Sequence, residues 1–130
     1  LNDGRVVTNF ITQALKGEDI TIYGDGNQTR SFSYVDDTVN GIIALINSNY
    51  NEVFNIGNPN EITVNQLATE IIKLTNANSK IINKNLPKDD PKQRQPDISK
   101  AKEKLDWKPE IDLETGLKKT ILWINSELNR

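Results

Sequence analysis

The chain has 130 residues and 35% apolar residues, enough for one compact domain with a modest core or for one piece of a larger protein. A net charge of −2 without a basic stretch argues against nucleic acid as a partner, and no apolar run approaches the roughly 20 residues that cross a membrane. Cysteine and histidine are absent, which excludes disulfides and thiolate chemistry and removes the commonest metal ligand, so we expect no metal site.

The first third of the chain alternates helical and extended patterns. Apolar side chains recur at helical spacing after residue 5, and Gly17 ends that helix. Ile20–Tyr23 is predicted to be a short strand, and Ser31–Val35 a second extended segment. Asp36 and Asp37 then put negative charge at the start of a predicted helix, where the helix dipole favours it.

The middle of the chain predicts a strand, a helix and a second strand. Val53–Ile56 has the apolar character of a buried strand, and Thr63 is expected to cap a helix that runs through Leu74. Lys80–Ile82 is a further candidate strand. The whole pattern is mixed α/β, with too few strands for a doubly wound sheet of its own.

The last third begins with a long polar loop, 83–96, which holds three prolines. A loop of that length inside a domain is usually functional or disordered. A short helix is expected over Ile98–Leu105, and Asp112 is expected to cap the final helix. Trp107 and Trp123 are interpreted as anchors of the core.

Three arginines are candidates for binding an anion. Lysines outnumber arginines twelve to four, so each arginine is a departure from the bias of this sequence. Arg5 and Arg30 follow glycine-containing turns, and Arg94 lies in the proline-rich loop. A guanidinium fork can hold a phosphate or carboxylate in a fixed orientation, which a lysine cannot. The alternative is that all three are solvated surface arginines.

The turn Gly24–Asn27 matches neither the glycine pattern that opens a Rossmann helix nor that of a P-loop. It is interpreted first as a tight turn, with ligand contact as the alternative. Tyr23, just before it, is either a core residue or a ring stacked near a base. Asp89 and Asp90 form a possible carboxylate pair, although in a lysine-rich loop such residues are usually solvated.

Several segments together resemble the C-terminal half of UDP-glucuronate decarboxylases, which are extended short-chain dehydrogenases/reductases. The resemblance covers essentially residues 1–130, which we interpret as a single unit. Two segments are the more particular to the decarboxylases, namely Gly-Arg-Val-Val at 4–7 and Asp-Asp-Pro-Lys-Gln-Arg at 89–94. Segments shared with the wider family, which includes 4-epimerases and 4,6-dehydratases, are Ile22–Phe32, Tyr34–Asp37, Phe54–Pro59 and Trp107–Pro109.

The resemblance implies a fold and a reaction. The fold would be the substrate-binding part of such an enzyme, mostly helical with a few short strands. The reaction would convert UDP-glucuronate to UDP-xylose and CO₂, with bound NAD oxidising and then reducing C4 of the sugar. Arg5 matches a family arginine near the sugar carboxylate and the nicotinamide, and Arg30 matches an arginine on the pyrophosphate. Tyr23 matches a position near the uridine, and Arg94 is assigned a second pyrophosphate contact.

The chain departs from the family in what it lacks. The glycine-rich NAD fingerprint and the Tyr-x-x-x-Lys pair are absent, so we expect NAD to be bound by a missing N-terminal Rossmann half and this chain to be inactive alone. Two alternatives stay open: a fragment of a sugar-nucleotide epimerase or 4,6-dehydratase, and a non-catalytic binding module. We expect a UDP-sugar ligand, a homo-oligomer and a cytoplasmic location, with neither nucleic acid nor a membrane as partner.

Overall fold

The computed structural model describes residues 5–85 and 93–130. Over these residues the chain forms five helices and four short strands. In chain order they are α1 (Val6–Leu15), β1 (Ile20–Tyr23), β2 (Thr29–Ser31), α2 (Val35–Ile46), β3 (Glu61–Thr63), α3 (Val64–Thr75), β4 (Ile81–Lys84), α4 (Ser99–Leu105) and α5 (Leu113–Leu128). The mostly helical α/β pattern with few strands, predicted from the sequence, is confirmed.

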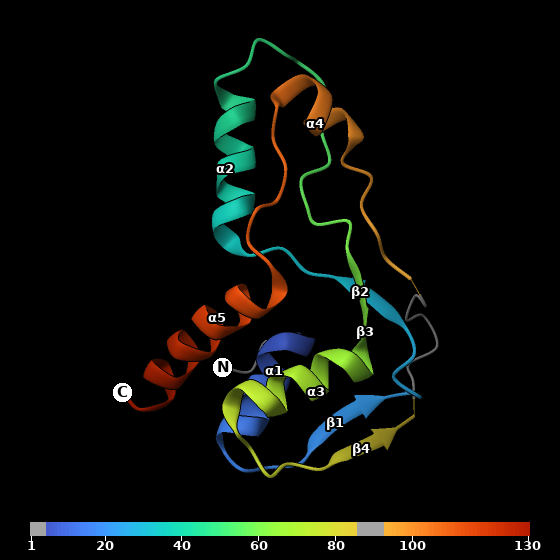
Figure 1. Ribbon diagram of the computed structural model, residues 1–130, viewed down its shortest axis with the longest axis vertical. Coiled ribbons are helices and arrows are strands. Elements are labelled where there is room, and N and C mark those ends of the chain that lie inside the picture. Colours follow the sequence, from blue (N-terminus) through green and yellow to red (C-terminus); the bar gives the residue numbers. More distant parts are fainter. Residues whose placement is uncertain (1–4, 86–92) are drawn as a thin grey trace.

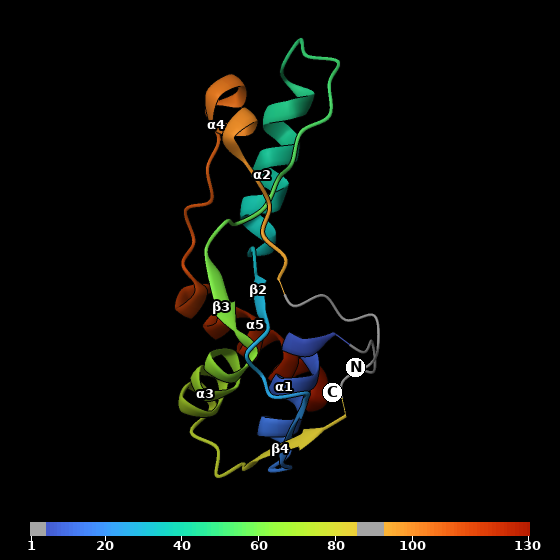
Figure 2. The ribbon, with the colours of Figure 1, turned by 90° about the vertical axis from the view of Figure 1, so that its right-hand side faces the viewer.

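The elements form two lobes, visible in both ribbon views (Figures 1 and 2). The lower lobe contains α1, α3 and α5 with the β1–β4 pair, and the upper lobe contains α2 and α4. Strands β2 and β3 lie between the lobes. Each lobe has its own cluster of buried apolar side chains, so the candidate site residues are carried by two separate cores.

The lower core is the larger of the two. Helix α1 contributes one face to it, and β1 and α3 contribute side chains that are fully enclosed. Its buried members are Phe10, Ile11, Ala14, Ile20, Ile22, Val64, Leu67, Ala68, Ile71, Leu117 and Ile124. In the upper lobe the buried cluster is Ile98, Ala101 and Trp107, with Phe54, Ile56 and Leu105 packed against it.

Two predicted helix starts are confirmed with their caps. The Thr63 side chain accepts a hydrogen bond from the Gln66 backbone N–H (3.1 Å), and the Gln66 side chain accepts one from the Thr63 N–H (2.9 Å). This reciprocal pair is a capping box. Asp112 accepts a hydrogen bond from the Thr115 N–H (2.8 Å) at the start of α5. Both caps satisfy backbone donors that the first helical turn leaves without a helical partner.

The strands pair in two separate ribbons. Strand β1 pairs in parallel with β4, with Ile20 opposite Ile81, and β2 pairs antiparallel with β3, with Arg30 opposite Ile62. The predicted strand Ile20–Tyr23 is confirmed, and the strand expected at Lys80–Ile82 is found as β4.

Some predictions about strands were wrong. Val53–Ile56 forms no strand: Phe54 and Ile56 pack against the cluster of Ile98, Ala101 and Trp107 without a pairing strand, while Val53 is 85% exposed. The extended segment expected at Ser31–Val35 overlaps the observed strand only at Ser31. Strand β2 spans Thr29–Ser31, and α2 already begins at Val35. Strand β3 was not predicted.

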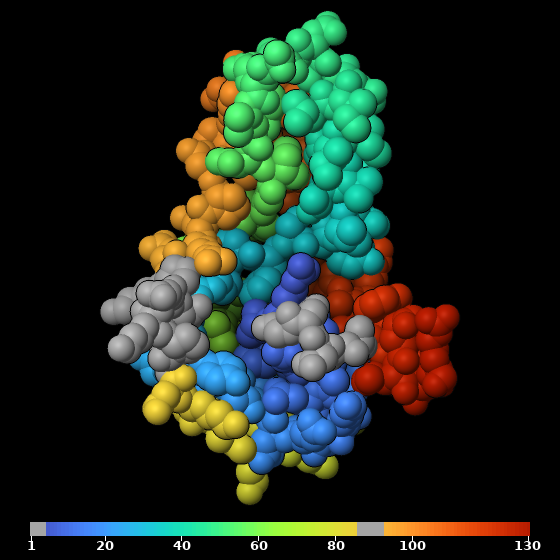
Figure 3. All heavy atoms as spheres, turned by 180° about the vertical axis from the view of Figure 1, so that it is seen from behind, coloured from blue at the N-terminus to red at the C-terminus, as the bar shows by residue number. Residues whose placement is uncertain are grey.

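Helix α2 leaves an apolar face open. Val35, Val39, Ile42, Ile43 and Ile46 are 45–73% exposed, and we call these five side chains the α2 face. The helix lies on the outside of the upper lobe in Figure 3. Trp123, which the sequence predicted to be a core anchor, is also 55% exposed, so that prediction was wrong for Trp123 and right for Trp107.

Candidate functional site

Tyr23 is the last residue of β1, at the edge where the chain turns toward the β2–β3 ribbon. Its side chain is 50% exposed, which excludes the interpretation of Tyr23 as a core residue. The Gln28 side-chain amide donates a hydrogen bond to the Tyr23 carbonyl (2.9 Å), which closes the turn between the two strands. The backbone at Tyr23 is therefore held by the turn, and its exposed ring is accessible to a flat ligand group.

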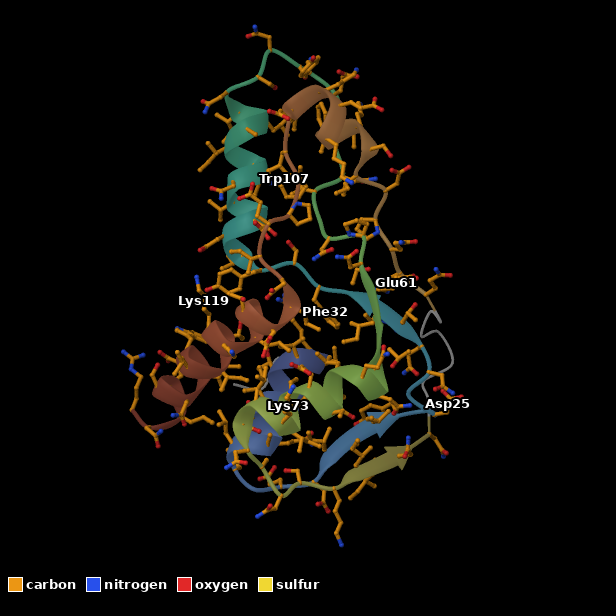
Figure 4. All side chains as sticks on the ribbon, viewed as in Figure 1. Asp25, Phe32, Glu61, Lys73, Trp107 and Lys119 are labelled. Atoms are coloured by element: carbon orange, nitrogen blue, oxygen red, sulfur yellow. The ribbon has the colours of Figure 1, made fainter. Side chains whose placement is uncertain are left out.

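The turn after Tyr23 is a structural turn. Gly24 and Gly26 have positive φ angles of 83° and 77°, and a Cβ on Gly26 would collide with the Asn65 side chain. The Asn65 N–H donates to the Gly26 carbonyl (3.0 Å), and the Asn65 side chain donates to the Asp25 carbonyl (3.0 Å). These bonds hold the turn against the start of α3, with Asp25 at its outer end (Figure 4). The first interpretation, a tight turn, fits these contacts.

Arg30 lies in the middle of β2, opposite Ile62 of β3. One guanidinium nitrogen donates to the Thr29 carbonyl (2.7 Å), and the side chain has further contacts with its surroundings. The residue is half-buried, so its charge sits at the junction of the two lobes with partial access to solvent. A half-buried guanidinium attracts an anion more strongly than a fully solvated one, because water screens it less.

Arg94 reaches the same strand from a distant part of the sequence. The Ser31 hydroxyl donates a hydrogen bond to the Arg94 carbonyl (3.2 Å), and the Gln93 side chain donates one to a Glu61 carboxylate oxygen (2.6 Å). Residues 93 and 94 therefore lie against the β2–β3 ribbon at the paired residues Ser31 and Glu61, one position after Arg30 in the chain. The Arg94 side chain is exposed. Two of the three candidate arginines are thus brought to one ribbon by contacts between segments more than 60 residues apart.

Arg5 immediately precedes α1, and its carbonyl accepts the first hydrogen bond of that helix from the Asn9 N–H (2.9 Å). Its exposed side chain lines a groove of about 730 Å³ between α1, the segment from β2 to α2, and α5. We call this hollow the Arg5 groove. Ser31 also lines it, directly after Arg30. The groove therefore connects the position of Arg5 with the strand that carries Arg30.

The opposite wall of the Arg5 groove comes from α5 and was not predicted as part of a site. Lys119 and Trp123 line it, and the Lys119 ammonium lies 5.5 Å from the centre of the Tyr34 ring, a cation–π contact. Figure 4 labels Lys119 on the side of α5 that faces the start of α2. Helical periodicity placed Lys119 and Trp123 on the last helix, but it could not show which face of that helix lines the Arg5 groove.

Asp112 also lines the Arg5 groove, at the start of α5. Hydrogen bonds from Thr115 lower the pKa of this carboxyl below its ordinary value, because they stabilise the ionised form. The acid is therefore charged at neutral pH, and its charge meets the positive end of the α5 dipole.

Asp89 and Asp90 lie outside the described residues, as does the Gly4 that precedes Arg5. Within the part of the chain that the structure describes, no group of three or more acidic side chains is placed to hold a metal ion. None of the helices in that part combines the length and the apolar character needed to cross a bilayer.

Comparison with known proteins gives the family. The family model for GDP-mannose 4,6 dehydratase matches residues 3–120. UDP-glucuronic acid decarboxylase 1 of Xenopus tropicalis is 51% identical over 128 residues, which is 98% of this chain and 30% of that protein. UDP-glucuronic acid decarboxylase 3 of Arabidopsis thaliana is 52% identical over 118 residues, 90% of this chain and 34% of that protein. The chain thus spans about a third of the length of these curated relatives.

Solved structures agree with the fold. UDP-glucose 4-epimerase of Thermotoga maritima, determined with UDP-glucose, superposes with a TM-score of 0.91 at 39% identity, over 95% of this chain and 40% of that one. UDP-glucuronic acid 4-epimerase of Bacillus cereus, in complex with UDP-glucuronic acid and NAD, gives 0.90 at 29% identity with the same coverage. The chain belongs to the GDP-mannose 4,6-dehydratase family of extended short-chain dehydrogenases/reductases, and the relatives of its sequence there include UDP-glucuronic acid decarboxylases.

Proposed function

We propose that this chain is the sugar-nucleotide-binding part of an NAD-dependent UDP-glucuronate decarboxylase, which converts UDP-glucuronate to UDP-xylose and CO₂. Identities near 50% to decarboxylases over nearly the whole chain support this substrate and reaction. The protein would act in the cytoplasm as a homo-oligomer.

The observation that carries the proposal is that the segments carrying Arg30 and Arg94 meet at one ribbon. Ser31, the neighbour of Arg30, donates its hydroxyl hydrogen bond to the Arg94 carbonyl. A pyrophosphate carries charge on both phosphates, and two guanidinium groups on one ribbon can each take one of them. Tyr23 lies one tight turn before β2, where its half-exposed ring can receive the uracil base. In this arrangement the uridine diphosphate lies along the end of β1 and the β2–β3 ribbon.

The sugar would then extend toward Arg5. Ser31 and Arg5 line the same groove, so a ligand whose pyrophosphate lies at β2 can place its next group there. The glucuronate carboxylate is an anion, and the Arg5 fork can orient it. Loss of CO₂ changes the charge at this carboxylate, so a guanidinium beside it can act on the reaction itself as well as on binding.

The described residues do not fit a cradle for NAD. A dinucleotide cradle requires a glycine-rich turn that leads from a strand into the start of a helix. In residues 5–85 and 93–130, the glycine-containing turn after β1 leads into another strand, and neither of the two connections from strand to helix that are fully described, β2 to α2 and β3 to α3, contains a glycine. We therefore assign NAD to a part of the enzyme outside this chain, and assign to this chain the binding and orientation of the substrate.

A UDP-sugar 4-epimerase is the second candidate, because solved epimerases superpose with TM-scores of 0.90 and 0.91. Their identities of 29–39% are lower than those of the decarboxylases, which is why we favour decarboxylation. The two reactions give different products from the same substrate. An epimerase inverts one hydroxyl and keeps all carbons, whereas a decarboxylase releases one carbon as CO₂.

The experiment uses a complete enzyme that contains this chain, incubated with NAD⁺ and UDP-glucuronate and followed by proton NMR and CO₂ release. UDP-xylose with an equal amount of CO₂ is the expected result. Formation of the C4 epimer without CO₂ would assign the chain to an epimerase. Absence of turnover, together with no binding of UDP to the same protein, would support the non-catalytic alternative.

A further inference from the structure

Asp37 is the only charged residue that is buried among the described residues, with 3% of its surface exposed. Its two carboxylate oxygens accept hydrogen bonds from two successive backbone N–H groups, those of Glu110 (3.1 Å) and Ile111 (3.0 Å). Its own carbonyl accepts a third bond, from the Trp107 indole N–H (3.1 Å). Without the Glu110 and Ile111 donors, the buried carboxylate would carry a large desolvation cost. The two bonds therefore hold Asp37 and residues 110 and 111 together.

These three bonds tie α2 to the segment that leads from α4 into α5. Asp37 lies in the first turn of α2, and residues 107–111 form the connection between the lobes. Further along α2, Gly41 leaves room for that connection, because a Cβ there would lie 2.6 Å from an Ile56 methyl and 3.2 Å from the Trp107 ring. Figure 4 labels Trp107 between α2 and this segment.

The same segment forms a wall of the Arg5 groove. Ile111, whose N–H donates to Asp37, lines the groove with Leu113, and so do Tyr34 and Val35 just before Asp37. Asp37 itself does not line the groove. The Asp37 carboxylate therefore links the start of α2 to residues 110 and 111. Both segments form this wall of the groove, and Asp37 lies outside it.

We propose that Asp37 is a positioning residue of the sugar-nucleotide site, which holds the wall of the Arg5 groove without touching the ligand. Its neighbour Asp36 is the natural comparison: it lies in the same helical turn with the same charge, but it is exposed. Both acids interact with the dipole of α2, and only Asp37 joins α2 to residues 107–111. The link to catalysis rests on the proposed function, whereas the link between α2 and residues 107–111 does not.

The first measurement is amide hydrogen exchange in the 130-residue chain. Asp37→Asn keeps the size of the side chain but turns an amide NH₂ toward a backbone N–H, so at least one bond is lost. We expect exchange at Glu110 and Ile111 to become about tenfold faster or more, while amides in α3 keep their protection. Asp37→Ser, whose hydroxyl is attached one bond closer to the backbone than the carboxylate oxygens, should have an effect at least as large at the same amides. Asp36→Asn, the matched control, should leave both amides unchanged.

A spectroscopic measurement reports on the same segment. With Trp123→Phe as background, fluorescence comes from Trp107 alone, whose indole is buried and donates to the Asp37 backbone carbonyl, so it reports on the position of residues 107–111 against α2. Asp37→Asn should shift its emission to longer wavelength and increase its quenching by acrylamide, and Asp36→Asn should do neither. Unchanged exchange at Glu110 and Ile111 in both Asp37 variants would overturn the proposal, whether or not the chain belongs to a decarboxylase. Loss of protection throughout α3 would also overturn it, since Asp37 would then serve the whole fold.

The third measurement is kinetic and uses a complete enzyme that contains this chain. Asp37→Asn should lower kcat/KM for UDP-glucuronate, by up to ~100-fold if the groove wall moves by about 1 Å, and Asp36→Asn should not. Local exchange at residues 110 and 111 without any change in kcat or KM would show that the link has no role at the site. An inactive wild-type enzyme would count against the proposed function, and the exchange result would still decide the structural part.

Discussion

The Ser31 hydroxyl lies 3.2 Å from the Arg94 carbonyl and donates a hydrogen bond to it, so β2 and the proline-rich segment hold each other in place. Arg30 directly precedes Ser31 in the chain, and Arg94 is the residue whose carbonyl accepts the bond. Two arginines held this way should act on a bound pyrophosphate together. Their contributions to binding are then expected to depend on each other, as for residues that share one ligand group.

Arg30→Lys and Arg94→Lys should each weaken binding, seen as a raised KM with kcat less changed, because the pyrophosphate is equally charged in the ground and transition states. Losing one charge-assisted contact costs about 1.5–3 kcal/mol, or about ten- to a hundredfold. The loss of binding free energy in the double variant should differ from the sum of the losses in the two single variants. Steady-state kinetics of a complete enzyme measures this, with Arg130→Lys as control, since Arg130 pairs with Glu127 at the end of α5. Strictly additive losses would show that the two arginines act independently and would contradict this prediction.

Arg5→Lys should fail differently, with its effect mainly on kcat. Arg5 lies in the groove where the sugar carboxylate is proposed to sit, and the charge there changes as CO₂ leaves. Lysine keeps the positive charge and removes the planar fork, so the variant tests orientation rather than attraction. Kinetics of Arg5→Lys and Arg30→Lys side by side give the comparison. A raised KM with unchanged kcat in Arg5→Lys would make Arg5 a binding residue and remove one reason to prefer decarboxylation over epimerisation.

The 130-residue chain alone should show no NAD⁺-dependent turnover of UDP-glucuronate. The described residues offer no glycine-rich turn from a strand into a helix, and hydride transfer needs a bound dinucleotide. The measurement is CO₂ release against a sample without protein. UDP-xylose above that background would contradict the assignment of NAD to another part of the enzyme.

The α2 face should make the isolated chain self-associate. Its five apolar side chains are 45–73% exposed, and soluble monomers seldom leave so large an apolar stripe open. Sedimentation at increasing concentration should show dimers or larger species, and an apolar dye should bind. Ile42→Gln combined with Ile46→Gln should reduce both signals. Leu122→Gln, on α5 and 70% exposed in the wild type, is the control and should reduce neither. A monomer at all concentrations without dye binding would contradict this.

Asp112 should contribute to stability in a pH-dependent way. Its pKa in the folded chain is lowered by hydrogen bonds from Thr115, so its contribution is fully present above the unfolded value of about 3.9 and is lost as pH falls through the folded value. Asp112→Asn keeps a good cap without a titrating group. Thermal unfolding between pH 2 and 6 should therefore show less loss on acidification in this variant than in the wild type. Glu114→Gln, which removes an exposed acid from the same turn, controls for general charge. Equal acid sensitivity in wild type and Asp112→Asn would contradict the prediction.

Features that depend on neighbours in the sequence were predictable. Thr63 and Asp112 cap their helices because a cap needs only the first turn that follows it. The strand Ile20–Tyr23 ends at a turn whose glycines require positive φ angles, so its end could be placed correctly. Family resemblance added the expected roles of Arg5, Arg30 and Tyr23, which no local pattern contains and which stay predictions.

Features that depend on distant contacts were not predictable. Val53–Ile56 has the composition of a strand, but Phe54 and Ile56 pack against the upper cluster and the backbone finds no pairing strand. Strand β3 was missed because it has only three residues, too few for a strand pattern to stand out, and they become a strand only beside β2. Asp37 and Asp36 looked alike as acids at the start of a helix. The difference between them comes from N–H groups more than 70 residues away.

The parallel pairing of β1 with β4 has a consequence for how the chain folds. Ile20 pairs with Ile81, so this ribbon can form only when the chain between them, which contains α2 and α3, closes into a loop, and the entropy cost of closing so long a loop delays its formation. Helix α3, with its capping box, and helix α1 can form earlier from local contacts and offer a surface for β1 to dock on. The end of β1, where Tyr23 lies, would then reach its final geometry late in folding, and the proposed uridine position would be among the last features of the molecule to appear.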